Sequence, residues 1–171
     1  MFMAVQLVEV TSDDLPLIDR WLRADHVRRY WGEPETNLQL LRKPPAKGNW
    51  RALIEADGGK VGLVLWQHPT RHELDEAGLF DVPESVIDID IMIGEASLTG
   101  QGAGSAAIRL VAETVLADPA VPFVIAATSV ENRVSQRAFA KAGFSSDRVF
   151  DDVPSGRYVL MVRHRQQPPR G

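Results

Sequence analysis

Residues 86–105 of the chain read VIDIDIMIGEASLTGQGAGS, a strand pattern followed by a glycine-rich turn. Apolar and polar residues alternate along the first half, as they do in a β-strand with one buried face. The four isoleucines therefore share one face of the expected strand, while Asp88, Asp90 and Met92 share the other. A strand that leads through glycines into a helix is a known way to hold phosphate, because N–H groups at the start of the helix point at the anion.

Two common phosphate-binding motifs do not fit this turn. A P-loop requires a lysine before its Ser or Thr, whereas Gly104 precedes Ser105 here. A dinucleotide fingerprint requires a third glycine, where this chain has alanine, and an acidic residue near the end of the next strand, which here ends in Ala126-Ala127. The turn by itself therefore indicates an anion site without naming the anion.

Hydrophobic periodicity, caps and turn residues predict the other elements. We expect strands at residues 5–10, 50–56, 60–67, 86–93, 123–127 and 157–163, and helices at 11–22, 26–31, 105–117 and 132–142. Residues 68–85 show no period and are expected to form a long loop, and residues 166–171 a frayed tail. This order predicts one domain, 1–171, with a mixed sheet and helices packed on it.

The composition restricts the possible partners. The chain has no cysteine, so disulfides and a cysteine nucleophile are excluded. It has no basic tract, no apolar run near the ~20 residues of a membrane helix and no secretion signal, so we expect a cytoplasmic protein that binds neither nucleic acid nor membrane. Between His72 and Ile108 the chain has eight acidic residues and no Lys or Arg, and such a field attracts a cationic ligand.

A second segment, Asn132-x-x-Ser135-x-x-x-Phe139-x-Lys141-x-Gly143-Phe144, follows the glycine turn. Together the two resemble the signature segments of the GNAT-superfamily N-acetyltransferases. The resemblance implies the GNAT fold, an α/β fold of the α+β type with a mixed, largely antiparallel twisted sheet flanked by helices. It also implies acetyl-CoA as co-substrate, without a metal.

The resemblance assigns coenzyme-binding residues. The turn would hold the pyrophosphate, and the backbone of the preceding strand and the Asn132 side chain would bind the pantetheine arm. The implied set is Met92, Ile93, Gly94, Gln101, Gly102, Ala103, Gly104, Ser105, Asn132 and Phe139. Two positions depart from the family pattern: Thr99 stands where Arg or Gln is usual, and Phe139 where a tyrosine often protonates the leaving thiolate. A general acid would then be water or Tyr158.

An early segment, Trp21-Leu22 followed by His26-Val27-Arg28-Arg29-Tyr30-Trp31-Gly32, resembles the aminoglycoside 6′-N-acetyltransferases. The distance from Asp90 to Gly100 along the chain, and the pair Asp118-Pro119, also match that group. Siderophore-type and ribosomal-protein acetyltransferases share the tryptophan segment. An acceptor other than an aminoglycoside therefore stays open, namely a siderophore precursor or a protein N-terminus.

Acetyl transfer requires a neutral amine, and Asp90 is the candidate base that removes its proton. Asp88 lies about 6.6 Å from Asp90 on the same strand face, and two nearby acids raise each other's pKa. The acceptor, a cationic amine, is expected to contact Asp88, Trp31, Trp66 and Tyr158. Because Phe139 cannot donate a proton, a catalytically idle acetyl-CoA-binding module is the third hypothesis. We expect a monomer or a homodimer.

Overall fold

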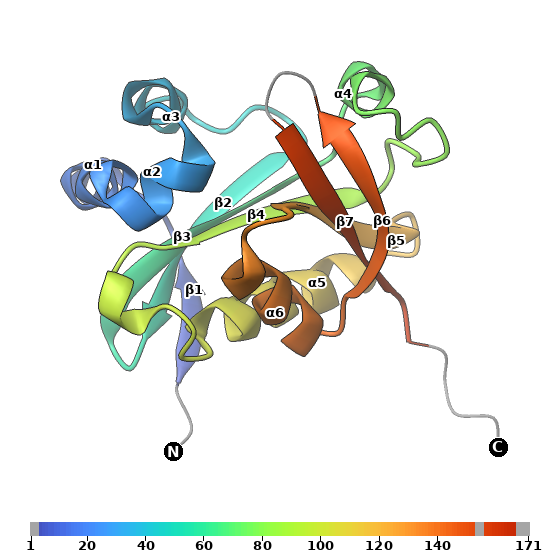
Figure 1. Cartoon of the computed structure of the whole chain (residues 1–171). Helices are drawn as coiled ribbons and strands as arrows, with labels where there is room; N and C mark the ends of the chain where they lie inside the picture. The colour runs from blue at the N-terminus through green and yellow to red at the C-terminus, as the bar shows by residue number, and fades with distance from the viewer. Residues whose placement is uncertain (1–3, 153–155, 167–171) are drawn as a thin grey trace, which may run out of the picture.

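The structure is a computed structural model that describes residues 4–152 and 156–166. Its centre is a twisted seven-stranded sheet (Figure 1), in the order β1–β2–β3–β4–β5–β7–β6. The strands are β1 (Val5–Val8), β2 (Asn49–Ala56), β3 (Gly59–Gln67), β4 (Ile87–Ile93), β5 (Phe123–Ser129), β6 (Ser145–Asp152) and β7 (Gly156–His164). Neighbours are antiparallel except β4 and β5, which are parallel. The expected mixed, largely antiparallel sheet is confirmed.

Helices cover both faces of this sheet. They are α1 (Leu15–Arg23), α2 (Asp25–Trp31), α3 (Pro34–Leu41), α4 (Arg71–Glu76), α5 (Ala103–Leu116) and α6 (Arg133–Lys141), with short 3-10 turns η1 (Ser12–Asp14) and η2 (Ala96–Leu98). In Figure 1, α5 and α6 lie on one face, while α1, α2 and α3 lie on the other face beside β2, β3 and β4. None of the described helices is long and apolar enough to cross a membrane.

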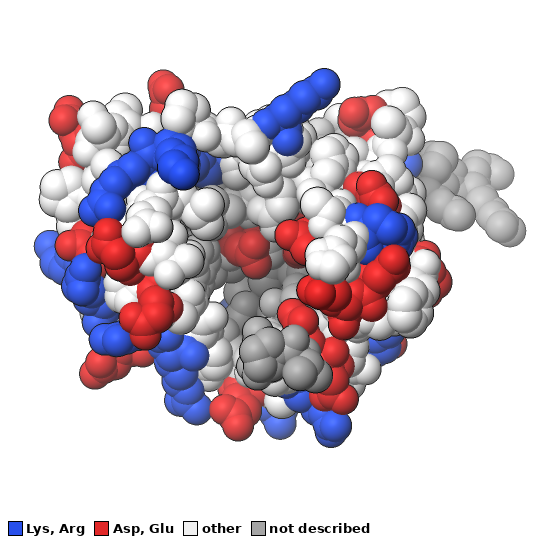
Figure 2. Space-filling view, turned by 90° about the horizontal axis from the view of Figure 1, so that it is seen from above, with Lys and Arg blue, Asp and Glu red and all other residues white. Residues whose placement is uncertain are grey.

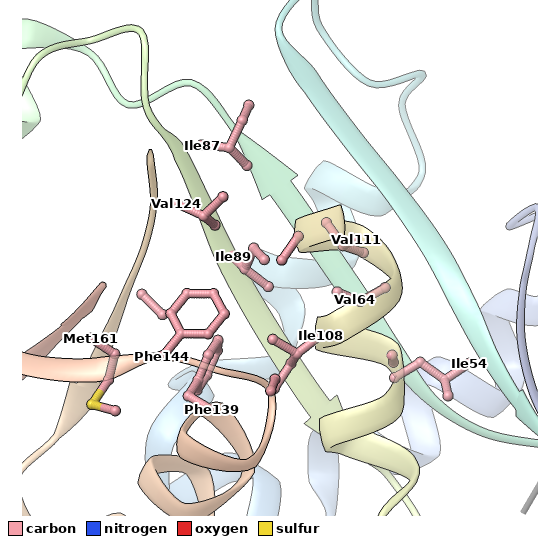
Figure 3. Packing of buried hydrophobic residues seen from close by; sticks show 14 of the residues in the cluster. Ile54, Val64, Ile87, Ile89, Ile108, Val111, Val124, Phe139, Phe144 and Met161 are labelled. Carbon is pink, nitrogen blue, oxygen red and sulfur yellow. The ribbon is translucent and has the colours of Figure 1, made fainter. Parts of the chain in front are cut away.

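The alternation along β4 divides the core as the sequence predicts. Ile87 and Ile89 are buried in the cluster under α5 and α6, where Ile108, Val111 and Phe139 also lie (Figure 3). Met92 is buried on the opposite face, in the cluster that α1, α2 and α3 form on the sheet. The two faces of one strand thus pack against different helix layers, and Asp88 and Asp90 share the face of Met92.

Three elements were missed or misassigned from the sequence. The structure contains α3, it contains α4 inside the expected loop 68–85, and β6 forms an edge of the sheet. The signal for α4 was present: the Thr70 hydroxyl accepts from the Glu73 N–H at 3.1 Å, and the Glu73 carboxylate accepts from the Thr70 N–H at 2.9 Å. Strand β6 is mostly polar because it is exposed and pairs with β7 alone, so it lacks an apolar period.

The predicted boundaries elsewhere hold to within a few residues. The Asp57-Gly58 turn joins β2 to β3 with φ of 50° and 83°, as a tight hairpin requires. Of the tail expected at 166–171, all but residue 166 lies outside the described residues.

Candidate active site

Strands β4 and β5 separate soon after they meet, and this separation creates the site. Only two residue pairs join them, Ile87 with Val124 and Asp88 with Ile125. Beyond Asp88, the edge of β4 that faces β5 has no strand partner. Gly94 donates its N–H to the Val61 carbonyl of β3. Backbone groups of successive residues in a strand point to opposite edges, so the N–H groups of Ile91 and Ile93 point away from β3 and into the gap. The gap therefore offers unpaired backbone groups to an extended ligand arm.

The Ile93 carbonyl is already used, because His26 Nε2 lies 2.9 Å from it. This contact ties α2 to the end of β4, and His26 lines the same cavity as Ile91 and Ile93. His26 belongs to the segment that resembles aminoglycoside acetyltransferases, yet nothing in that segment predicts that its ring lies against β4.

The glycine turn leads directly into α5, as expected. Gly100 and Gly102 have φ of 76° and 99°, which favour glycine strongly. Ala106 is the first helical residue whose N–H bonds the preceding turn, at the Gly102 carbonyl, so the N–H groups of 103–105 stay available. Gln101 turns its side chain away from them, onto the Ser97 carbonyl at 2.8 Å. The turn thus has the geometry of an anion site at a helix N-terminus.

This turn and the β4–β5 gap share one cavity of about 440 Å³. Of the ten coenzyme residues that the sequence suggested, six line it: Met92, Ile93, Gly102, Gly104, Ser105 and Asn132. The Asn132 Oδ1 caps α6 by accepting from the Ser135 N–H at 3.2 Å, so its amide nitrogen is the group that remains for a ligand.

The other four suggested coenzyme residues do not line this cavity. Ala103 packs into the core, and Gln101 lies on the outside of the turn. A Cβ on Gly94 would lie 2.0 Å from the Trp21 ring, so this glycine is needed for packing against α1. Phe139 is 2% exposed and lies edge-on against Phe144, at 5.1 Å between ring centroids. Phe139 thus packs in the core and also lines a second cleft, described below.

Three cations on α6 also line the cavity, namely Arg133, Arg137 and Lys141. They recur every four residues and so lie on one side of the helix. Their charge favours phosphate groups near the glycine turn. These cations were not among the expected coenzyme residues, although their spacing within residues 133–141 can be recognised in the sequence.

A second cleft, of about 1100 Å³, opens on the other side of the gap. Figure 2 looks into the hollow from above and shows acidic atoms inside it. Asp90 lines this cleft, and its Oδ2 accepts a hydrogen bond from Gln67 Nε2 at 3.1 Å. Enclosure by the surrounding protein raises the pKa of Asp90, and the nearby Glu73 charge adds to the rise. A carboxylate with a raised pKa accepts a proton more readily than an ordinary one.

Trp31 and Tyr158 line the cleft as expected, but Trp66 does not. Trp31 comes from α2, and Tyr158 comes from β7, where it stacks on Phe150 at 5.7 Å between centroids. Leu65, not Trp66, pairs with Asp90, so Trp66 faces the opposite side of the sheet and packs against the core under α5. The expectation that Trp66 lines the acceptor site is wrong, because Trp66 and its neighbour Leu65 face opposite sides of the sheet.

Asp88 lies behind Asp90 and does not line the cleft. Its Oδ1 is buried and has no hydrogen-bond partner among the described residues. Burial raises its pKa well above the usual range, and the Asp90 charge raises it further. Asp88 is therefore better placed to act on the charge of Asp90 than to contact an acceptor.

Asp88→Asn is expected to raise the melting temperature at pH 8. The folded-state pKa lies above the unfolded value of about 3.9, so ionised Asp88 destabilises the fold at every pH above that folded-state pKa. The gain in melting temperature should shrink as the pH falls through the folded-state pKa, because Asp88 of the folded parent is then protonated and as neutral as the asparagine of the variant. Melting curves of both proteins between pH 4 and pH 8 measure this, and a lower melting temperature of the variant at pH 8 would contradict it.

The described residues contain no group of three or more acidic, histidine or cysteine side chains that could hold a metal ion. His72, which the sequence places near His68 and Glu73, instead lies 3.1 Å from Glu76.

Comparison with known proteins agrees with this geometry. A family model described as an acetyltransferase (GNAT) domain matches residues 10–152. Two curated relatives named aminoglycoside N(6')-acetyltransferase type 1, from Klebsiella pneumoniae and Serratia marcescens, are each 26% identical over 170 residues, 95% of this chain and 84% of theirs. A solved structure of AAC(6')-Ib with coenzyme A has a TM-score of 0.78 at 23% identity, over 96% of this chain and 95% of that one. A solved structure of AAC(6')-Ib with coenzyme A and kanamycin has a TM-score of 0.77 at 23% identity, over 96% of this chain and 95% of that one.

Proposed function

Because the chain belongs to the GNAT acetyltransferase family, we propose that it transfers the acetyl group of acetyl-CoA to a primary amine of a cationic small molecule, namely the 6′-amine of an aminoglycoside. The observation that carries this proposal is the position of Asp90. Its carboxylate lines the acceptor cleft on the strand whose free edge opens into the coenzyme cavity. The names of the two curated relatives support the choice of acceptor.

The donor would bind along β4 and the glycine turn. The N–H groups of residues 103–105 and the cations of α6 suit the pyrophosphate, and the free N–H groups of Ile91 and Ile93 suit the pantetheine arm. This differs from the expectation for Met92, whose N–H points toward β3 by alternation. Ile91 and Ile93 are thus our candidates to stabilise the oxyanion that forms on the thioester carbonyl.

The acceptor would arrive as an ammonium ion and pair with ionised Asp90. Asp90 takes one proton, and the neutral amine attacks the thioester carbon. The new C–N bond forms, the C–S bond breaks, and the thiolate leaves. Phe139 cannot protonate it, so the Tyr158 hydroxyl in the same cleft or water supplies the proton. The acetylated nitrogen still carries two protons; it loses one to solvent and keeps the other as the amide N–H. Asp90 then releases its proton to solvent, and the group that protonated the thiolate regains one, so one proton is released per turnover. No covalent enzyme intermediate is needed.

We also propose that the protein acts in the cytoplasm, as a monomer or a homodimer that binds coenzyme A and the amine but no nucleic acid. The acidic stretch 73–95 and the absence of a basic tract support a cationic small molecule as the acceptor.

A thiol-release assay with a panel of amines tests the acceptor. We expect acetyl-CoA turnover with kanamycin and ribostamycin, at a kcat/KM at least about tenfold above that for hydroxylysine or for peptides with a free N-terminus. Turnover of peptides or hydroxylysine without turnover of either antibiotic would contradict the aminoglycoside proposal and favour the alternative acceptors. Absence of turnover with every amine would favour the idle binding module.

A further inference from the structure

The acceptor cleft carries cations as well as acids. Among its lining residues, Arg29 and Glu131 form an ion pair at 3.4 Å and neutralise each other. The other charged residues that line the cleft are the acids Asp90 and Glu73 and the cations Lys43 and Arg51. A purely cationic acceptor uses the acids but meets repulsion from these two cations.

Arg51 lies in the same row of the sheet as Asp90. Arg51 of β2 pairs with Leu65 of β3, and Leu65 pairs with Asp90 of β4. Residues that are directly opposite in an antiparallel sheet share a face, so Arg51 and Asp90 both face the cleft. Two strand spacings separate their backbones by about 10 Å. A base and an arginine thus extend from the same face of the sheet, two strands apart.

The Arg51 guanidinium is positioned but not neutralised. Its Nη1 donates to the Leu40 carbonyl at 3.3 Å and its Nη2 to the Lys43 carbonyl at 2.7 Å. These two bonds hold the group between β2 and the end of α3, and they use only two of its five N–H donors. No carboxylate of the described residues lies within ion-pair distance of it. Partial burial also lowers its pKa, as expected for a cation that lacks an anionic partner.

We propose that the cleft accepts a second class of substrate, namely small amines that also carry a carboxylate, with Arg51 binding the carboxylate while Asp90 takes the proton from the amine. This inference rests on the proposed acetyl transfer at Asp90, but not on the aminoglycoside as acceptor. The remaining donors of the guanidinium fork match a carboxylate, and such charge-assisted bonds are among the stronger ones in proteins. Arg51 then selects amino-acid-like acceptors and takes no part in the chemical step.

A matched pair of acceptors isolates the carboxylate. The acceptors ε-aminocaproate and ε-aminocaproamide have the same chain and a single amine, and they differ in charge at the far end. We expect the parent enzyme to acetylate the carboxylate with a kcat/KM about tenfold or more above that for the amide. Equal values, or a preference for the amide, would overturn the inference.

Variants of Arg51 assign the preference to its side chain. In Arg51→Gln the ratio of the two kcat/KM values should fall to about 1, and in Arg51→Lys it should be intermediate, because the charge remains without the fork. Arg42→Gln is the matched control: this neighbouring arginine pairs with Glu35 at 2.8 Å, outside the cleft, and should keep the parent ratio. The ratio is measured within one protein, so partial misfolding cannot imitate its loss. An unchanged ratio in Arg51→Gln would overturn the assignment.

Kanamycin, tested in the same assay, separates this inference from the proposed function. Turnover of kanamycin with no preference for ε-aminocaproate would leave the aminoglycoside proposal intact and refute the second acceptor class. Turnover of ε-aminocaproate with the expected preference, without kanamycin turnover, would support the role of Arg51 and refute the aminoglycoside as acceptor.

Discussion

Asp90→Asn is expected to lower kcat/KM for the acceptor amine by about 10²–10⁴-fold, the range typical for the loss of a general base. The amide cannot take the amine proton, and it also removes the charge that pairs with the ammonium. The parent should lose activity as the pH falls through the raised pKa of Asp90, because the protonated acid neither binds the ammonium nor accepts its proton. Thiol release measured from pH 5 to pH 9 should show this acid limb in the parent but not in the variant.

The matched control for Asp90→Asn is Glu84→Gln. Glu84 is an exposed acid in the same acidic stretch, it does not line either cavity, and its change should leave both kcat and the pH profile as in the parent. The affinity of Asp90→Asn for coenzyme A should also stay near the parent value, because its carboxylate faces the acceptor cleft. Retention of more than about a tenth of the parent activity would rule out Asp90 as the base.

Gly104→Asp is expected to weaken coenzyme A binding by about 10–100-fold, or about 1.4–2.8 kcal/mol. A Cβ at this position would point toward Ile93, Ala138 and Ile91 at 3.8–3.9 Å, ordinary contact distances, in the cavity that holds the glycine turn. The new carboxylate would stand where the pyrophosphate is expected and would repel it. Titration calorimetry with coenzyme A measures the loss.

The fold itself should tolerate Gly104→Asp. The residue lies in the first turn of α5, where a negative charge interacts favourably with the helix dipole, so the melting temperature should be unchanged or higher. Gly104→Asn adds nearly the same volume without charge, and it separates repulsion from obstruction. If Asp and Asn weaken binding equally, steric obstruction accounts for the loss; if neither weakens it, the turn does not bind the coenzyme.

The core of the fold could be predicted because its signals are local. The alternation from Ile87 to Ile93 fixed both faces of β4, and the glycines at 100–104 with Asn132 and Gly143 marked the ends of α5 and α6. Strand β6 could not be recognised in this way, since an exposed edge strand needs no apolar face. Helix α3 was missed as well, although Pro34 stands at a favourable first helical position.

The site could be predicted only in part, since its key properties depend on how distant segments meet. The sequence predicted that Asp88 and Asp90 share one strand face. It did not predict that Asp88 would have a buried oxygen without a hydrogen-bond partner among the described residues, or that Asp90 would line a cleft. The position of Arg51 beside the cleft could not be predicted for the same reason, since only the pairing of β2, β3 and β4 aligns it with Asp90. Trp66 shows most clearly why the site could not be fully predicted, because a shift of one residue along a strand moves a side chain to the other face of the sheet.

The most direct test of acetyl transfer in the proposed cleft is the product formed from acetyl-CoA and kanamycin, identified by mass spectrometry and NMR. The proposed function predicts an antibiotic that carries a single acetyl group on the 6′ nitrogen, with one free thiol released for each product molecule. An unmodified antibiotic and no released thiol, from protein that still binds coenzyme A, would contradict it.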